Sequence, residues 1–208
     1  MSGPTHPVTN VNYLDAVNFC DWLTRQERSL GLLPEGWAYR LPTDSEWSQM
    51  VDLAESPDST PMRHHLRIRN HWPWGRSPER EPSSGNYYTP RGASERNGFH
   101  GMDPFEQTAP VGRFTQNAYG LFDLGGNVWE ITENPMEPES PPNPQAWRAH
   151  RGGSWTTISL EVMLSSYRLS RRQGREDVGF RCVLAPENTR PALSSLTEAK
   201  PTHLGGPE

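Results

Sequence analysis

The chain has 208 residues, a formal net charge of −5 at pH 7 and a hydrophobic content of 33%. A chain of this length can bury one sizeable core or two small ones, and its acidic balance argues against a general nucleic-acid-binding surface, which needs an excess of basic residues. The sequence contains 18 Gly, 21 Pro and 8 Trp. We therefore expect a loop-rich globular domain whose core depends on large aromatic side chains.

The periodicity of the chain predicts two helices and several short strands. Apolar positions recur at helical spacing after Asn12, which predicts an amphipathic helix from Asn12 to about Arg28. Thr43 and Glu46 form a capping box, which predicts a second helix that continues to residue 54. Segments 147–155 and 179–184 are typical of strands, and residues 57–110 are typical of long ordered loops with short strands. These elements together predict the α+β class.

The ends of the chain and its two cysteines set its organisation. We expect one domain over residues 1–186 and a mobile tail over 187–208, where Pro, Ser, Thr and Glu predominate. Cys20 and Cys182 are too few for a disulfide framework, although one bridge stays open. The sequence has neither an apolar run of membrane-spanning length nor a secretory signal, so we expect a cytoplasmic protein, or one displayed at a surface within a larger assembly.

Three motifs in a fixed order carry a family resemblance. They are Tyr39-Arg-Leu-Pro-Thr43, the segment from Gly120 to Glu130, and Arg151-Gly-Gly-Ser-Trp155 with the closing Val178-Gly-Phe-Arg-Cys182. Together they resemble the formylglycine-generating enzyme family, whose domain is a variant of the C-type lectin fold. The resemblance covers about residues 7–184 and implies that fold, with an additional strand region usually present before the segment that begins at Pro7.

The resemblance does not extend to the family's copper chemistry. Its enzymes oxidise thiols with a copper-binding cysteine pair between Arg-Gly-Gly-Ser and Gly-Phe-Arg, but residues 156–178 contain no cysteine. Cys20, on the apolar face of the first helix, and Cys182 are typical of buried structural thiols. We expect no copper and no formylglycine formation. An oxidoreductase or maturation enzyme that acquires its metal differently stays open as an alternative, although His64, His65 and His71 lack the spacing of a two-histidine, one-carboxylate iron site.

Calcium is the metal that the resemblance implies, because irregular loops supply the oxygen ligands it takes. By resemblance to the family's calcium sites, the first site comprises the side chains of Asp123 and Glu130 and the carbonyls of Gly126 and Val128. The second comprises the side chains of Asn86 and Asp103 and the carbonyls of Tyr87 and Phe105. Either role would be structural. In the alternative interpretation, Asp123 and Asn127 make turn hydrogen bonds and Glu130 pairs with an arginine.

The tryptophans fall into two groups. Those within or near the motifs, Trp22, Trp47, Trp129 and Trp155, are expected in the core or scaffold. Trp72 and Trp74 lie in a segment similar to the family's Pro-Trp-Gly loop, where they are packing anchors or, alternatively, part of a ligand surface.

The stretch between Trp155 and Val178 is the candidate functional region. It is similar to the hypervariable segment of target proteins of diversity-generating retroelements, which lies between the same two motifs. Its apolar residues follow neither helical nor strand periodicity, as expected for an exposed binding face. We predict a noncatalytic protein that binds a protein or other macromolecular ligand through segments 156–163 and 169–177. The expected contact residues are Thr156, Thr157, Ile158, Ser159, Leu160, Val162, Leu169, Ser170, Arg171, Arg172, Gly174 and Asp177. A divergent loop, or an interaction module of a larger chain, is the alternative. A local basic patch of Arg168, Arg171, Arg172 and Arg175 also stays open.

Overall fold

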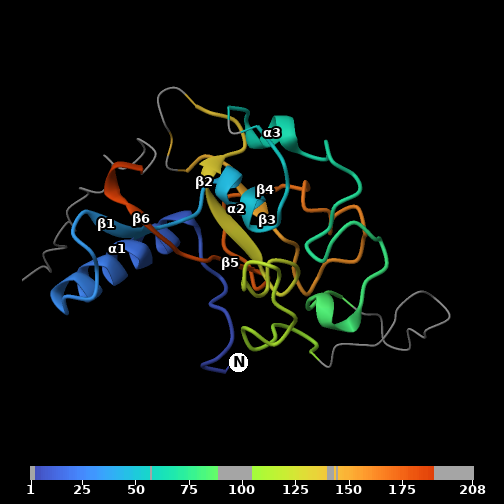
Figure 1. Cartoon of the computed structure of the whole chain (residues 1–208), viewed down its shortest axis with the longest axis horizontal. Coiled ribbons are helices and arrows are strands. Elements are labelled where there is room, and N and C mark those ends of the chain that lie inside the picture. The colour runs from blue at the N-terminus through green and yellow to red at the C-terminus, as the bar shows by residue number, and fades with distance from the viewer. Residues whose placement is uncertain (1–2, 57, 89–104, 140–142, 144, 190–208) are drawn as a thin grey trace, which may run out of the picture.

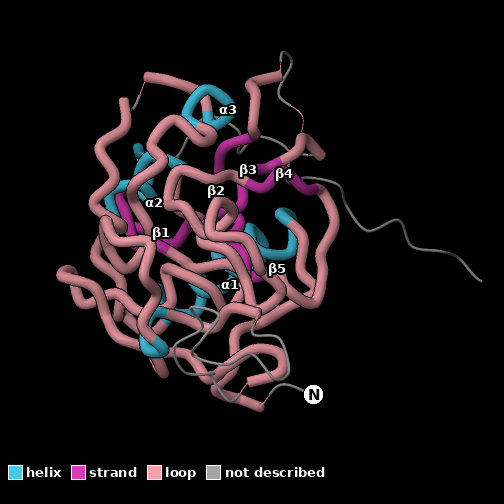
Figure 2. The backbone as a smooth tube through the Cα atoms, turned by 90° about the vertical axis from the view of Figure 1, so that its right-hand side faces the viewer, coloured by secondary structure: helices cyan, strands magenta, loops and turns pink. Residues whose placement is uncertain are grey.

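The computed structural model describes residues 3–56, 58–88, 105–139, 143 and 145–189. A central sheet has the strand order β4-β3-β2-β5, and a separate ribbon pairs β1 with β6. The strands are β1 (Trp37–Arg40), β2 (Trp129–Pro135), β3 (Arg148–Arg151), β4 (Leu169–Arg171), β5 (Val178–Gly179) and β6 (Val183–Pro186). The helices are α1 (Tyr13–Ser29), α2 (Asp44–Met50) and α3 (Pro61–His64), with 3-10 turns at Pro82–Ser84 and Glu187–Thr189. Figure 1 shows α1 beside the β1–β6 ribbon and α2 against the central sheet, whereas loops make up most of the remaining tube in Figure 2.

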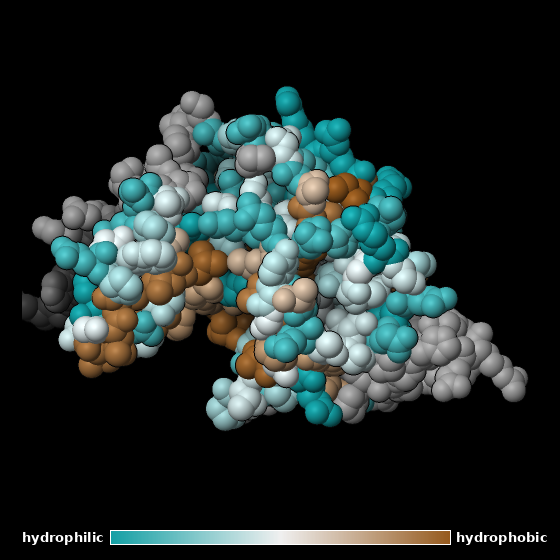
Figure 3. Space-filling view, viewed as in Figure 1, coloured by the Kyte–Doolittle hydropathy of each residue, from teal (hydrophilic) through white to brown (hydrophobic). Residues whose placement is uncertain are grey.

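The first predicted helix is confirmed. Asn12 caps α1 by accepting hydrogen bonds from the amides of Leu14 and Asp15, and the Asp15 carboxylate accepts from the amide of Asn12. One face of α1 enters the main core through Ala16, Val17 and Cys20. The expectation that Trp22 is also buried is wrong, because it lies on the opposite face and is 47% exposed. Figure 3 shows apolar side chains exposed over this part of the surface.

The second predicted helix begins correctly but ends earlier than expected. Thr43 and Glu46 form the predicted capping box. Helix α2 stops at Met50, because Asp52 adopts a positive φ of 55° and the amide of Leu53 turns back to the carbonyl of Ser48 at 2.9 Å. This turn buries Leu53 beside Trp47, so packing ends the helix before residue 54, where the sequence predicted its end.

Both predicted strands are shorter than the sequence pattern indicated. Strand β3 ends at Arg151, because Gly152 and Gly153 have positive φ values of 92° and 81°. A Cβ atom at Gly152 would lie 2.8 Å from the carbonyl oxygen of Leu124, so this close approach needs glycine. The predicted strand 179–184 is divided between two sheets: β5 pairs in parallel with β2, and β6 pairs with β1.

Three apolar clusters form the core, and the candidate functional region contributes to two of them. Val162, Tyr167 and Leu169 pack against the main cluster, and Met163 and Leu164 belong to a cluster around Trp72 and Tyr87. Trp47 and Trp129 are buried as expected, and the ring of the buried Trp72 stacks at 6.2 Å on that of Trp74, which is half-buried. Much of segment 156–177 is therefore bound into the fold.

Two further expectations concern the tail and the membrane. The first three residues of the predicted tail form the Glu187–Thr189 turn, in which Glu187 pairs with Arg28 at 2.6 Å. Residues 190–208 lie outside the described residues. No helix in the described part of the chain has the length and apolar character needed to cross a membrane.

Candidate functional site

A buried ion network holds the base of the candidate functional region. Asp44 is the first residue of α2, and its carboxylate binds Arg151 at 2.5 Å and Arg168 at 2.9 Å. Arg168 also pairs with Glu55. Burial alone would raise the pKa of Asp44, but the two guanidinium groups lower it below its usual value. Burial lowers the pKa of Arg151 to about 10, so both arginines remain charged at neutral pH.

This network closes the loop that carries the exposed residues. Arg151 ends β3 and Arg168 immediately precedes β4, so one carboxylate binds both ends of the excursion between them. The arginine and aspartate side chains are almost completely buried. A loop with both ends fixed has fewer accessible conformations, which favours a single arrangement of whatever it exposes.

His64 lies beside the network without forming part of a separate metal site. Its Nδ1 atom is 3.9 Å from both Asp44 and Glu55, and these three side chains are close enough to surround an ion. The carboxylates are already paired with two arginines, whose positive charges oppose a cation there. His65 instead accepts the amide hydrogen of Arg168, so the two neighbouring histidines have different partners.

The backbone from Trp155 to Met163 is fixed by hydrogen bonds to distant parts of the chain. The Thr157 carbonyl accepts from the amide of Tyr88 at 3.2 Å, and the Leu160 carbonyl accepts from the indole of Trp72 at 3.0 Å. Ile158 is nevertheless 63% exposed and Leu160 is 47% exposed. The loop thus presents apolar side chains to solvent from a constrained backbone.

The expectation that the whole predicted set projects into solvent is wrong for Thr157 and Asp177. The Thr157 hydroxyl accepts from the amide of Ser154 at 3.0 Å, and both Thr157 and Asp177 are buried. The Asp177 carboxylate accepts from the Thr156 hydroxyl at 2.8 Å and from Arg175 at 3.1 Å. Burial opposes ionisation, but these two donors lower the pKa of Asp177. The Thr157 side chain therefore holds the turn at Ser154, and the Asp177 carboxylate joins the two predicted segments through Thr156.

In the second predicted segment, 169–177, some residues pack against the rest of the fold and others are exposed. Leu169 and Val162 lie against the main core, which is why their positions lacked a surface pattern. A Cβ atom on Gly174 would meet the backbone of Asn10 at 2.6 Å, so this position cannot carry a varied side chain without displacement. Arg172 is exposed, with its guanidinium 5.4 Å from the centre of the Trp147 ring.

The residues that remain available form what we call the contact surface. It comprises Thr156, Ile158, Ser159, Leu160, Ser170, Arg171 and Arg172, all exposed or half-buried. The basic patch left open by the sequence does not include Arg168, because that side chain is enclosed in the ion network.

The two cysteines meet in the core. Their sulfur atoms are 3.4 Å apart, and Cys20 is completely buried while Cys182 is half-buried. The contact with Cys182 and burial raise the pKa of Cys20, whereas the hydrogen bond from Cys20 lowers the pKa of Cys182. Both thiols are separate from the contact surface and lie between α1 and the chain that enters β6.

In the first predicted calcium loop, Glu130 pairs with an arginine, as the alternative interpretation expected. Both carboxylate oxygens of Glu130 accept from Arg181, and one also accepts from the indole of Trp47 at 2.8 Å. Asp123 accepts from the amide of Gly112 at 2.7 Å, but its Oδ1 atom is buried without a donor among the described residues. Burial raises the pKa of Asp123. Gly126 and Val128 lie in the buried turn between these carboxylates.

The second predicted loop is described only in part. Asn86 is fully buried, and its amide donates to the carbonyl of Gln107 at 2.7 Å, while its Oδ1 atom has no donor within the described ranges. Tyr87 is buried in the third core cluster, and the Phe105 ring contacts that of Phe114 at 6.4 Å. Asp103 lies outside the described residues.

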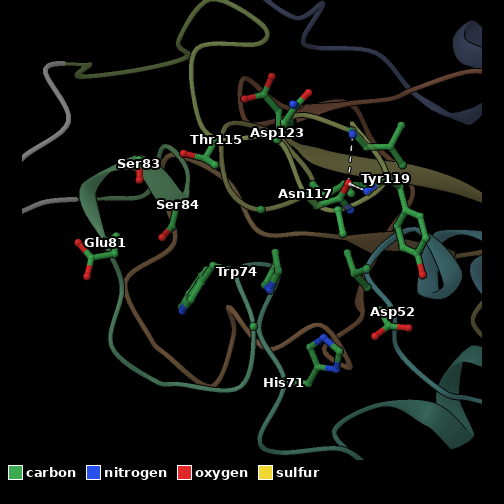
Figure 4. Close-up of a pocket in the computed structure, with 18 of the residues that line it drawn as sticks. Asp52, His71, Trp74, Glu81, Ser83, Ser84, Thr115, Asn117, Tyr119 and Asp123 are labelled. Carbon is green, nitrogen blue, oxygen red and sulfur yellow. Dashed lines mark hydrogen bonds between the residues drawn. The ribbon is translucent and has the colours of Figure 1, made fainter.

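Sequence patterns did not predict the cavity shown in Figure 4. It has a volume of about 590 Å³ and lies between the Trp74 loop and the loop that contains Asn117 and Tyr119. The Asn117 side chain accepts from the amides of Tyr119 and Leu121 and so holds the second loop in place. Its mixed lining has no sequence motif, because it comes from separate stretches of the chain.

Comparisons with known proteins identify the family. Residues 1–186 match the model of the sulfatase-modifying factor enzyme 1-like domain. The chain is 30% identical over 186 residues to the inactive C-alpha-formylglycine-generating enzyme 2 of Mus musculus, covering 85% of this chain and 48% of that protein. It is 29% identical over 210 residues to the formylglycine-generating enzyme of Thermomonospora curvata, covering 88% and 57%. The chain thus spans about half the length of these relatives.

Solved structures agree with this assignment. The variable protein 1 of Treponema denticola superposes with a TM-score of 0.55 at 18% identity, covering 89% of this chain and 73% of that one. CarF superposes with a TM-score of 0.57 at 20% identity, covering 89% and 69%. The predicted C-type-lectin-like α+β fold of the formylglycine-generating enzyme type is confirmed. The chain belongs to the family of sulfatase-modifying factor enzyme 1-like domains.

Proposed function

We propose that this domain is a noncatalytic ligand-binding protein that binds a macromolecular partner through the contact surface. The observation that carries the proposal is the exposure of Ile158 and Leu160 on a backbone fixed by Tyr88 and Trp72. Burying a side chain of this size against a partner contributes about 1.5–3 kcal/mol, and a fixed loop loses little entropy on binding. A relative that is named as an inactive enzyme supports a noncatalytic role within this family.

The proposal is tested by panning a phage-displayed peptide library against the immobilised domain. Selected peptides should bind the wild type and lose at least tenfold in affinity for the double variant Ile158→Ser/Leu160→Ser. The matched control is Leu30→Ser/Leu32→Ser, which removes two leucines that are 68% and 66% exposed elsewhere. Peptides that depend equally on both pairs would show general hydrophobic adhesion and overturn the proposal.

A finer part of the proposal is that a diversity-generating retroelement varies this surface. Its support is the arrangement of exposed residues between the two framing motifs and the likeness to a protein titled variable protein 1. Sequencing the gene across a population should find an adjacent reverse transcriptase, a near-copy of the codons for 151–182, and substitutions concentrated at Ile158, Leu160 and Arg172. Substitutions spread evenly over the buried codons would contradict it.

The proposal also predicts that the protein makes no formylglycine. A Cys-containing sulfatase-motif peptide incubated with the protein and copper should retain its thiol, because no cysteine lies between Ser154 and Gly179. Formylglycine above the level of a no-protein control would favour the oxidoreductase alternative.

Calcium remains a proposed structural ion, and the two predicted sites differ in fit. The side-chain oxygen of Asn86 that has no donor among the described residues suits an oxygen-ligated cation, as does that of Asp123. The first site does not fit as it stands, because Arg181 occupies both oxygens of Glu130. Calcium at 100 times its Kd should raise the free energy of unfolding by about 2.7 kcal/mol, and Asn86→Ala should remove that increase. Identical melting curves with calcium and with chelator would reject the ion.

A further inference from the structure

A second cavity, of about 350 Å³, lies where the start of α1 meets β3 and β4. Three arginines, Arg148, Arg171 and Arg172, line it together with His150, and no carboxylate occurs among its described lining residues. This volume is at the lower end of the range for small-ligand pockets. Its wall is thus strongly basic within a protein whose net charge is −5.

Arg148 is the unusual member of this wall, because it is almost completely buried without an ion pair to any described carboxylate. Its exposed fraction is only 1%. Its Nη1 atom donates to the carbonyl oxygen of Glu133 at 2.8 Å, and its guanidinium lies over the ring of Tyr13 at 3.8 Å. Its Nε atom has no acceptor among the described residues. A buried cation ordinarily has an acidic partner, but the carboxylates of Glu133 and Glu139 act on Arg148 only through space, without an ion pair among the described residues.

The second strand of the cavity wall shows the same deficit. The Nε atom of Arg171 on β4 is also buried without an acceptor in the described part of the chain. Among the acidic groups nearby, Glu133 accepts from the Tyr13 hydroxyl at 2.8 Å through Oε1, whereas its Oε2 atom has no donor among the described residues, and Asp177 accepts from Thr156 and Arg175. The two guanidinium groups therefore line one small space, and the Nε atom of each is buried without an acceptor among the described residues.

Helix α1 adds to the positive potential. Asn12 and Tyr13 line the cavity, so the helix of 17 residues begins at its wall. The first amides are already bonded to the Asn12 side chain, so α1 contributes its dipole rather than free donors, and the Asp15 carboxylate in its first turn offsets part of that potential. Arg172 is exposed at the mouth, where it can move towards an incoming anion.

We propose that this cavity binds an oxyanion, a carboxylate or phosphate group, and that it receives an acidic side chain of the protein partner. A planar guanidinium offers paired N–H donors that match the two oxygens of a carboxylate. Arg171 and Arg172 belong to the contact surface. The assignment of the acidic side chain to a protein partner therefore rests on the proposed function. The anion site itself depends only on the cavity.

The test uses a tetraglutamate peptide, its tetraglutamine counterpart and inorganic phosphate as probes in calorimetric titrations of the whole chain. Tetraglutamate should bind, tetraglutamine should not, and phosphate should compete with tetraglutamate. The double variant Arg171→Gln/Arg172→Gln should weaken tetraglutamate binding at least tenfold, and the single variant Arg172→Gln should weaken it severalfold. The charge-matched control, Arg63→Gln/Arg67→Gln, removes two exposed arginines elsewhere and should bind as the wild type does.

Equal weakening by both double variants would show a nonspecific charge effect and overturn the site. Phosphate binding without tetraglutamate binding would overturn the acidic side chain as the occupant. The failures of the two proposals are also distinguishable, because Ile158→Ser/Leu160→Ser should leave tetraglutamate binding unchanged. Panned peptides that do not distinguish Ile158→Ser/Leu160→Ser from Leu30→Ser/Leu32→Ser, with retained tetraglutamate binding, would remove only the proposed function.

Discussion

The buried ion network and the contact surface invert the usual distribution of side chains within one region of the fold. Asp44, Arg151 and Arg168 place three charges in the interior, whereas Ile158 and Leu160 place apolar groups in solvent. The charges are paired and so tolerate burial, but only while every partner is present. The apolar side chains have no such partners. The comparison teaches that a rigid frame can support a surface whose composition has little effect on stability.

The largest loss in the free energy of unfolding is expected when the buried ion network is broken. Arg151→Met leaves Asp44 with one arginine instead of two, and removing one partner of a buried pair typically costs about 3–5 kcal/mol. Urea unfolding should show this loss. Arg69→Met, which breaks the exposed pair with Glu161, should cost no more than about 1 kcal/mol. Equal losses in the two variants would mean that the network does not hold the loop.

The next largest effect is a pH dependence of the free energy of unfolding, which comes from His150. This residue pairs with Leu169 in segment 169–177. Burial lowers its pKa from 6.5 to about 4, a shift that Arg171 reinforces and Asp177 opposes. The unfolded state therefore binds more protons between these values, so stability is complete above pH 6.5 and declines by about 3 kcal/mol as the pH falls to 4. Urea midpoints measured from pH 7 to pH 4 should fall, and His150→Gln should flatten the profile. An unchanged slope in that variant would assign the decline to other groups.

A smaller effect separates tolerated from constrained positions within the second segment. Gly174→Ala should cost about 1–3 kcal/mol, because its Cβ atom would lie 2.6 Å from the backbone of Asn10. Ser170→Ala, at a half-buried position on β4, should change the free energy of unfolding by less than about 0.5 kcal/mol. Thermal melts of the two variants provide the comparison. If Gly174→Ala has the same melting temperature as the wild type, segment 169–177 is packed less tightly than its contacts with Asn10 indicate.

The smallest effect sharpens the comparison between adjacent residues. Thr157→Val keeps the shape of the side chain but leaves the buried amide of Ser154 without its acceptor, at a cost of about 1–2 kcal/mol. Ile158→Ser should change stability by less than about 0.5 kcal/mol while it reduces peptide binding. A cooperative transition lost on Ile158→Ser would place that residue in the core and contradict the contact surface.

The sequence by itself determined the family, the fold class and the starts of both long helices. Caps and amphipathic spacing are local, so Asn12 and the Thr43–Glu46 capping box could be recognised from residues a few positions apart. The framing motifs could be recognised for the same reason. The lack of periodicity among the apolar residues of this region predicted exposure correctly for Ile158 and Leu160 but wrongly for Val162 and Leu169, which pack against the main core.

Only the tertiary structure decided which residues within the functional region are structural. Asp44 meets Arg151 and Arg168 from more than 100 positions away, and Gly174 lies against Asn10 from the other end of the domain. No local pattern encodes such contacts. The same holds for the exposure of Trp22, the division of residues 178–186 between two sheets, and the cavity that Arg148 and Arg171 share. Burial depends on what the rest of the chain places opposite a residue, and in a loop-rich fold that arrangement is set by long-range packing.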